Sequence, residues 1–356
     1  MMNTASITSP QEMRVQLGAI LAGIVPDLEL GLKAELAAEI NRLKREKNAV
    51  ILGHNYMEPA LFNSIPDFIG DSLGLCRKAA ETDCDIIVFC GVEFMAETAK
   101  ILNPEKTVLL PSRAGCSLAS SITAEDVREL KRRFPDVPVV TYINTYADVK
   151  AESDICCTSA NAAAVVDSLK TETVIFIPDE YLAKNVARQT GKHIIFPKSN
   201  ALGPQLEGDQ VDTEIDYQMI GWRGRCEVHE KFTVEDVQNI RKQFSDVVVL
   251  AHPECSPEVV DASDFSGSTT AMTKYVAGSK ARRYLLLTEC AMGDNVAAAN
   301  PGKEMLRLCS VRCPHMNQIT LEDTLKALQR NQYVIDVPEE IRVRAARAVQ
   351  RMIAIG

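Results

Sequence analysis

The chain of 356 residues carries a net charge of −9, and its 46% hydrophobic and 24% charged residues are typical of a folded globular protein. The acidic balance and the single tryptophan argue against nucleic acid as a partner. No stretch approaches the roughly 18 apolar residues of a membrane helix, and no basic segment precedes an apolar one near the start. We therefore expect a cytoplasmic protein of two or three domains with no membrane partner.

Short aliphatic runs, typical of strands buried in a parallel sheet, alternate with helical patterns along the chain. An amphipathic helix is predicted over 29–47, and strands are predicted over 49–56, 85–91, 137–144, 173–179, 247–254 and 284–289. Helical patterns follow three of these strands, at 72–82, 160–171 and 270–283, and closing helices are predicted over 320–353. The alternation of strand and helix predicts an α/β fold.

The predicted strands form an internal repeat. The first strand of each pair starts 36, 36 and 37 residues before the second, counted from 49 to 85, 137 to 173 and 247 to 284. Such a period indicates one βαβ unit used three times. We place a helical lead-in at 1–47, the three units at 48–118, 119–228 and 229–316, and C-terminal helices at 317–356.

Polar side chains stand at the ends of the three leading strands, where open α/β sheets bind their ligands. They are His54 and Tyr56, then Tyr142 and Asn144, then His252 and Glu254. A hydroxyl follows 17 or 18 residues later in each unit: Ser72, Ser159 and Thr269. Each hydroxyl opens a predicted helix at a natural N-cap position, so simple capping is the alternative to a shared binding site.

Eleven cysteines in a chain with no export signal point to metal binding or catalysis more than to disulfides. Each unit places a cysteine in the loop after its later strands: Cys116, Cys226, and either Cys309 or Cys313. Most of the others are expected in the core, with Cys156 and Cys157 flanking a helix start and Cys290 ending a strand. Cys255, directly after Glu254, is the spare cysteine expected nearest the site.

Taken together and in this order, the segments GHNYMEPA, GDSLGL, SRAGCSLA, TYINTYADVKAESD, TSANA, WRGRCEVHE, HPEC, GSTTAM and CPHMNQITL resemble the bacterial quinolinate synthase family. They span about 48–330, and the combination is far more specific than any single motif. The resemblance implies an α/β fold of three pseudo-symmetric, three-layer αβα domains, each with a small, mostly parallel sheet, around a central active site. It also implies a transferase of NAD biosynthesis that condenses iminoaspartate with dihydroxyacetone phosphate to give quinolinate, phosphate and water.

The same resemblance implies a cofactor and a set of site residues. A [4Fe-4S] cluster would be held by Cys116, Cys226 and Cys313, leaving one iron open as a Lewis acid. Tyr56, His54, His252 and Glu254 are the expected proton-transfer residues. The expected substrate contacts are Tyr56 together with His54, Ser72, Tyr142, Ile143, Asn144, Ser159, His252, Pro253, Glu254 and Thr269. L-Aspartate oxidase, which would supply iminoaspartate, is a possible transient partner.

The chain departs from the family pattern near its C-terminal end. Cys290 stands where a small residue is expected, and of the CxxCxxC that some members carry only Cys309 and Cys313 are present. A redox disulfide of the kind that motif supports is therefore not predicted.

Other function classes can be raised from the residues. No G-x-G-x-x-G follows the first strand and no phosphate-binding G-x-x-x-x-G-K-S/T is present, which disfavours a nicotinamide oxidoreductase or a nucleotide triphosphatase. The stretch from Gly70 to Gly74 fits the G-x-S-x-G of hydrolases, but His54 precedes the serine and the segment before it is a poor central strand. Cys309, Cys313 and His315 could instead serve a structural zinc in a scaffold or sensor protein.

Overall fold

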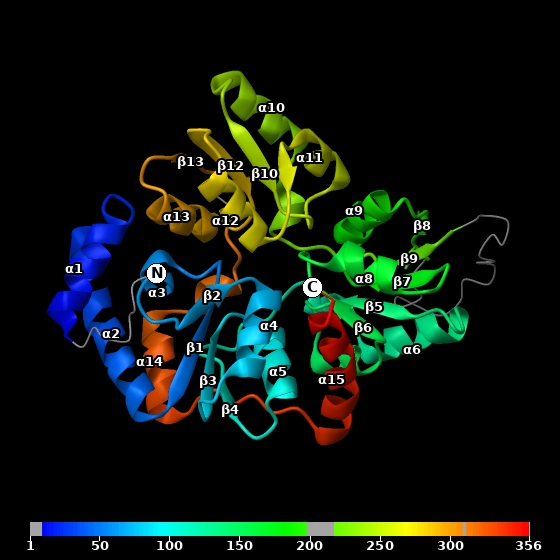
Figure 1. Cartoon of the computed structure of the whole chain (residues 1–356), viewed down its shortest axis with the longest axis horizontal. Coiled ribbons are helices and arrows are strands. Elements are labelled where there is room, and N and C mark those ends of the chain that lie inside the picture. The colour runs from blue at the N-terminus through cyan, green and yellow to red at the C-terminus, as the bar shows by residue number, and fades with distance from the viewer. Residues whose placement is uncertain (1–8, 198–216, 309–310, 356) are drawn as a thin grey trace.

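The computed structural model describes residues 9–197, 217–308 and 311–355, and they build three separate parallel sheets. The sheets have strand orders β2-β1-β3-β4, β6-β5-β7-β9-β8 and β11-β10-β12-β13. Figure 1 shows the three sheets, each with its own helices, arranged around a common centre. Fold class and threefold division are therefore as predicted from the sequence.

The first sheet contains β1 (Ala49–His54), β2 (Phe68–Gly70), β3 (Ile86–Cys90) and β4 (Thr107–Leu109). Its helices are α2 (Asp27–Glu46), α3 (Pro59–Phe62), α4 (Ser72–Glu81) and α5 (Glu93–Leu102), preceded by α1 (Pro10–Leu21). Figure 1 shows α2 on one side of this sheet and α4 and α5 on the other. Every residue of β1 is buried, as expected for a strand covered on both faces.

The second sheet contains β5 (Val139–Tyr142), β6 (Ile155–Cys157), β7 (Val174–Ile177), β8 (Ile194–Ile195) and β9 (Met219–Gly221). Its helices are α6 (Ala124–Arg133), α7 (Ala147–Ala151), α8 (Ala162–Ser168) and α9 (Glu180–Thr190). The third sheet contains β10 (Val248–Ala251), β11 (Phe265–Ser266), β12 (Arg283–Leu287) and β13 (Glu304–Leu306). Its helices are α10 (Val234–Gln243), α11 (Pro257–Ala262), α12 (Thr269–Gly278) and α13 (Cys290–Ala299).

One aspartate contact recurs in all three units and shows how closely they correspond. The carboxylates of Asp67, Asp154 and Asp264 each accept the backbone N–H of the leading strand of their unit at 2.8 Å. Each aspartate also donates its own N–H back to the same strand residue. The loop before each edge strand is thereby fastened to the central strand in the same register.

The two C-terminal helices pack on different units. Helix α14 (Leu321–Arg330) packs on α2 and β3 of the first unit, whereas α15 (Glu339–Ile353) packs on α7 and β6 of the second. Helix α2 begins two residues before the predicted start, and the sequence analysis did not predict α1, which opens with a capping box at Ser9. The predicted domain boundaries themselves stay a prediction.

The placement of three minor cysteines differs from the prediction. Cys156 and Cys157 lie in β6 and do not flank a helix start, while Cys290 begins α13 and does not end a strand. A run of only three buried residues is too short to be recognised as a strand by its pattern.

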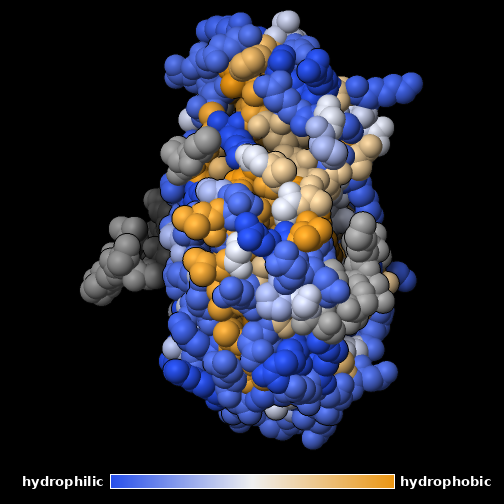
Figure 2. All heavy atoms as spheres, turned by 90° about the vertical axis from the view of Figure 1, so that its left-hand side faces the viewer, coloured by the Kyte–Doolittle hydropathy of each residue, from blue (hydrophilic) through white to orange (hydrophobic). Residues whose placement is uncertain are grey.

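The outer face of α1 and α2 exposes a few large hydrophobic side chains. Leu28 is 86% exposed, Val15 66% and Leu32 64%. Figure 2, which looks at this side of the molecule, shows hydrophobic residues gathered between larger hydrophilic areas. In the described part of the chain, no helix combines the length and apolar character needed to cross a bilayer.

Candidate active site

A cavity lies at the centre, and residues of all three units line it. Of the predicted site residues, the lining includes His54, Tyr56, Ser72, Cys116, Tyr142, Asn144, Ser159, Cys226, His252, Glu254, Thr269 and Cys313. Ile143 is a core residue and Pro253 lines a neighbouring surface pocket, so these two do not line the cavity. The carboxyl ends of three parallel sheets meet here, which is where α/β folds bind ligands.

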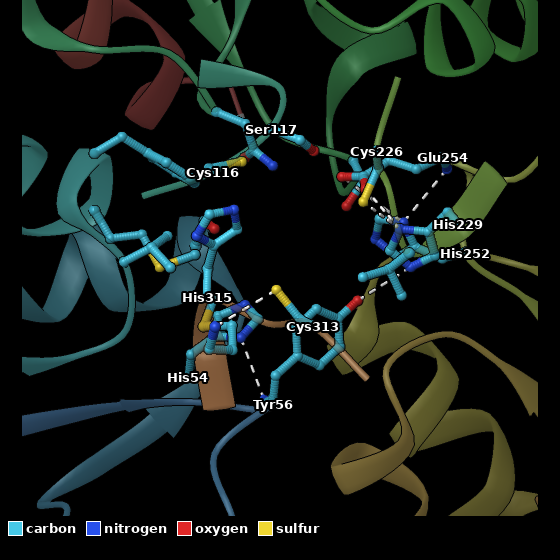
Figure 3. Close-up of a pocket in the computed structure, with 18 of the residues that line it drawn as sticks. His54, Tyr56, Cys116, Ser117, Cys226, His229, His252, Glu254, Cys313 and His315 are labelled. Carbon is cyan, nitrogen blue, oxygen red and sulfur yellow. Dashed lines mark hydrogen bonds and ion pairs between the residues drawn. The ribbon is translucent and has the colours of Figure 1, made fainter. Parts of the chain in front are cut away.

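Three cysteines enter the cavity from equivalent loops after β4, β9 and β13. Figure 3 shows the sulfur atoms of Cys116, Cys226 and Cys313 on different sides of one central space. The backbone N–H groups two and three residues after each cysteine lower the pKa of its thiol, and a short 3₁₀ helix begins at the later of these two residues. The N–H of Met316 lies 3.5 Å from the sulfur of Cys313. Peptide N–H donors stabilise negative charge on sulfur, so each loop is built to hold a thiolate.

Without a bound metal these sulfurs would be thiols. Burial raises the pKa of Cys116 to about 12, and the nearby Cys313 adds to the shift. Burial also raises the pKa of Cys226, with Glu254 and Cys116 contributing. The three side chains are therefore within electrostatic reach of one another, and binding of a metal would displace their protons.

The three loops share a further sequence pattern, not used for the prediction above, that identifies the same three cysteines. In each loop a threonine follows the cysteine by seven residues and an aspartate follows it by ten: Thr123 and Asp126, Thr233 and Asp236, Thr320 and Asp323. Each threonine caps the next helix by accepting the N–H of that aspartate. Cys309 has Met316 at the corresponding position, so the pattern selects Cys313. Cys309 itself lies outside the described residues.

The two strand-end histidines have the same orientation and tautomer. The N–H of Tyr56 donates to Nδ1 of His54 at 3.2 Å, and the N–H of Glu254 donates to Nδ1 of His252 at 3.3 Å. Burial lowers the pKa of His54 to about 4 and that of His252 to about 3, so both rings are neutral near pH 7. A neutral imidazole that accepts at Nδ1 carries its proton at Nε2, and each ring therefore offers one N–H donor.

Glu254 is the charged centre of a buried hydrogen-bond network. Its Oε2 lies 2.7 Å from Nδ1 of His229, and its Oε1 accepts the hydroxyl of Tyr142. Burial by itself would raise the pKa of Glu254, but His229, His252 and the hydrogen bond of Tyr142 outweigh it and lower this pKa below its ordinary value. Burial and the charge of Glu254 raise the pKa of Tyr142 well above its usual range, so the tyrosine remains a proton donor.

His229 is the main site residue that the sequence analysis did not single out. It is buried, lines the cavity, stacks on His252 at a centroid distance of 4.6 Å, and places Nδ1 3.1 Å from the sulfur of Cys226. The available signal was its position three residues after a predicted cysteine ligand, inside the quoted WRGRCEVHE motif. Its functional surroundings come from the other strands and could be seen only in the fold.

The expectation that the three hydroxyl residues are N-caps is wrong. Asp71 caps α4 and Ser268 caps α12, which leaves Ser72 and Thr269 as the first residues inside those helices. Ser159 lies in a turn before α8, whose N-cap is Asn161. All three hydroxyls line the cavity without serving as the cap, so the capping alternative loses its structural basis.

The hydrolase and structural-zinc alternatives find little support in this geometry. Ser72 is an ordinary helical residue and is not among the positive-φ residues of the described chain, whereas a nucleophile elbow needs a strained turn. His315 faces Glu227 at 3.0 Å. Among the described residues, the only three ligand atoms within 4.8 Å of one another belong to Cys226, His229 and Glu254. These three atoms lie close together because Nδ1 of His229 contacts both the Glu254 carboxylate and the Cys226 sulfur.

The donor set at the cavity fits an iron–sulfur cluster better than a single ion. The ligands of one tetrahedral zinc lie only about 4 Å apart, given metal–ligand distances near 2.3 Å. The three cysteine sulfurs do not form such a group within 4.8 Å, although they surround one space from equivalent loops. Three thiols around a wider space suit a four-iron cluster, which takes its ligands at separate corners.

Comparisons with known proteins identify the family of the chain. The chain is 51% identical over 333 residues to "Quinolinate synthase 2" of Mesorhizobium japonicum, covering 93% of this chain and 95% of that protein. It is 50% identical over 337 residues to "Quinolinate synthase" of Agrobacterium fabrum, covering 94% and 90%. The model of the family described as "Quinolinate synthetase A protein" matches residues 38–354. With three α/β units around a cavity that their cysteines, histidines and hydroxyls line, the chain belongs to the quinolinate synthase family of enzymes.

Proposed function

We propose that the enzyme condenses iminoaspartate with dihydroxyacetone phosphate to form quinolinate, releasing phosphate and water, as a transferase of NAD biosynthesis with a [4Fe-4S] cluster. The observation that supports this most is the cysteine loop shared by the three units, which places Cys116, Cys226 and Cys313 around one cavity with backbone N–H groups that lower the pKa of each thiol. When bound, a cluster with three cysteine ligands supplies one open iron as a Lewis acid for substrate oxygen atoms. The remaining chemistry belongs to the side chains of the cavity.

The donors of the cavity match the negative charges of the two substrates. The neutral rings of His54 and His252 present Nε2–H groups, and Ser72, Ser159 and Thr269 present hydroxyls. Two substrates that carry carboxylates and a phosphate need several such donors in a space from which water is largely excluded. In this assignment the main role of His54 and His252 is to donate hydrogen bonds from Nε2, because Nδ1 of each ring already accepts a backbone N–H group.

Proton transfer is assigned to Tyr56 and Glu254. Glu254 is ionised and buried, with only 3% of its surface exposed. Its two carboxylate oxygens hold His229 and Tyr142 in fixed orientations. Tyr56 reaches toward His229 from the opposite side of the cavity, as Figure 3 shows. Burial and the charge of Glu254 raise the pKa of Tyr56 well above its ordinary value, so Tyr56 stays protonated and can act as an acid.

The test is quinolinate formation by anaerobically purified enzyme supplied with both substrates. Omission of either substrate is the control, and Glu254→Gln should lower kcat by at least about a hundredfold, because it removes the charge that orients His229. No quinolinate from the cluster-loaded enzyme, or full activity in the Glu254→Gln variant, would contradict the proposal.

A structural zinc in a non-catalytic scaffold is the alternative, and the group Cys226, His229 and Glu254 is the feature that could hold such an ion. Metal analysis distinguishes the two: stoichiometric zinc in a colourless protein would favour the scaffold. We further propose a cytoplasmic location, a transient contact with L-aspartate oxidase, and unit boundaries at 48–118, 119–228 and 229–316.

A further inference from the structure

The turn after the leading strand is built differently in the second unit. In the first and third units an imidazole holds this turn, because the N–H of Tyr56 or Glu254 donates to the strand-end histidine. The second unit has Tyr142 in place of the histidine, and the only side-chain acceptor of a tyrosine lies at the far end of its ring. The turn that carries Asn144, which lines the cavity, is therefore held by other contacts.

Lys150 of α7 supplies one of these contacts. Its Nζ donates to the carbonyl oxygen of Thr145, the residue directly after Asn144. Thr145 in turn donates its hydroxyl to the carbonyl of Tyr142 at 3.2 Å and its N–H to that of Ile143 at 2.8 Å. Lys150 and Thr145 are both fully buried, so loss of the lysine donor would leave a buried carbonyl with one partner fewer.

The first residue of α7 has a partner in another unit. Counted from the strand ends, Ala147 corresponds to Pro59 and Pro257, the first residues of α3 and α11. Proline has no N–H, whereas the N–H of Ala147 donates to Oε2 of Glu97 at 2.9 Å. Because Glu97 belongs to α5, this hydrogen bond joins the second unit to the first.

Lys150 and Glu97 form a charge pair at the junction of the first and second units. Burial lowers the pKa of Lys150 and raises that of Glu97 to about 7, and the charge of each group opposes the shift of the other. The ammonium of Lys150 also lies 5.5 Å from the ring centroid of Phe94, a residue of α5 that lines the cavity. At the position of Lys150 the other two units have Phe62 and Val260, so this arrangement occurs at one of the three equivalent turns.

We propose that Lys150 and Glu97 are positioning residues that hold the Asn144 turn against the first unit, so that the Asn144 side chain meets the bound substrate in a fixed orientation. The inference rests on the proposed function and on the expected contact of Asn144 with the substrate. A polar group that is held in place before the substrate binds needs no reordering when it binds.

The first test is a double-mutant cycle between Lys150→Met, which removes the donor at similar length, and Asn144→Ala. If the lysine acts through Asn144, Lys150→Met should lower kcat/KM at least about tenfold in the wild type but less than about twofold in Asn144→Ala. The affinity for quinolinate, measured over the same cycle, keeps the comparison possible if a variant turns over too slowly. If Lys150→Met does not fold, Glu97→Leu takes its place in the cycle.

Lys44→Met is the matched control. Lys44 is also a buried lysine, and its Nζ donates to the carbonyl of Ile65 at 2.8 Å, but neither residue lines the cavity. This variant should lose stability and keep kcat/KM within about twofold of the wild type.

A second measurement does not depend on turnover. Amide hydrogen exchange, followed by mass spectrometry on peptides that cover 143–151, should be at least about tenfold faster in Lys150→Met and Glu97→Leu than in the wild type. It should stay within about threefold in Lys44→Met and in Glu97→Gln, which keeps an acceptor for Ala147. An equal loss of kcat/KM and of quinolinate affinity in both backgrounds of the cycle, or unchanged exchange in Lys150→Met, would overturn the inference. If the wild type forms no quinolinate, the proposed function fails, while the exchange still decides whether Lys150 and Glu97 hold the turn.

Discussion

Adjacent residues at the start of α12 separate helix stabilisation from substrate binding. Ser268 is the N-cap and accepts the N–H of Ala271, while Thr269 is the first helical residue and lines the cavity. The two side chains also have different partners, since Ser268 donates to Asp71 at 3.0 Å and Thr269 accepts from Asn55 at 2.8 Å. Substituting each in turn should therefore affect different properties.

Thr269→Val removes a donor that we assign to a charged substrate oxygen, and such a hydrogen bond contributes about 1.5–3 kcal/mol. The expected loss in kcat/KM is about tenfold to a hundredfold. The unfolding free energy should fall by about 1 kcal/mol, because Asn55 loses its acceptor at 2.8 Å and keeps only the longer contact with Thr270 Oγ1 at 3.4 Å. Ser268→Ala should instead lose about 1–2 kcal/mol of unfolding free energy, through the cap and the contact with Asp71, with kinetics near those of the wild type.

The assay combines anaerobic urea unfolding and steady-state quinolinate formation on the same preparations, because a partly unfolded enzyme would imitate weak binding. Thr269→Ser, which keeps the hydroxyl, is the matched control and should recover most of the lost kcat/KM. If Thr269→Val lost only stability and kept normal kcat/KM, the hydroxyl would have no role in binding and the shared-site reasoning would be wrong.

Three further predictions follow from the site. Iron and activity should be lost in anaerobic preparations of Cys116→Ala, Cys226→Ala and Cys313→Ala, whereas Cys309→Ala should keep both. If Cys309→Ala lost its iron and Cys313→Ala kept it, Cys309 would be the third ligand. Air should inactivate the enzyme, and iron, sulfide and a thiol should restore it; full activity after days in air with an unchanged visible spectrum would argue against an open iron. The pKa of His54 is about 4 in the fold and 6.5 in the unfolded chain, so the unfolded state binds the proton more tightly. The free energy of unfolding should therefore decrease as the pH is lowered from about 6.5 to about 4, by about 3 kcal/mol from this residue. His54→Gln should flatten that slope in urea unfolding between pH 7 and pH 4.5, and an unchanged slope would show that burial of His54 does not control it.

The architecture could be predicted because its central strands are buried on both faces and read as continuous apolar runs. β1, β5 and β10 lie within predicted strands, as do β3 and β7, and β12 begins one residue before its predicted strand. The edge strands were not predicted. β11 has two residues and β2 three, too few for a pattern, and their pairing depends on the central strand beside them.

The site could be predicted in part for a similar reason. Polar residues at strand ends share an edge of the sheet, which is how His54 and His252 were found from sequence alone. The tautomers of these rings depend on the turns that follow their strands, and the position of His229 beside Tyr56 depends on contact between units. The contact between Tyr56 and His229 joins residues 173 apart in the chain, so it leaves no local sequence pattern.

The most direct test of the account is iron and acid-labile sulfide analysis of anaerobically purified protein, made together with a quinolinate assay on iminoaspartate and dihydroxyacetone phosphate. We expect a brown protein with about four iron and four sulfide per chain that forms quinolinate. A colourless protein with stoichiometric zinc, or an iron-loaded protein that forms no quinolinate from these substrates, would contradict the central claim.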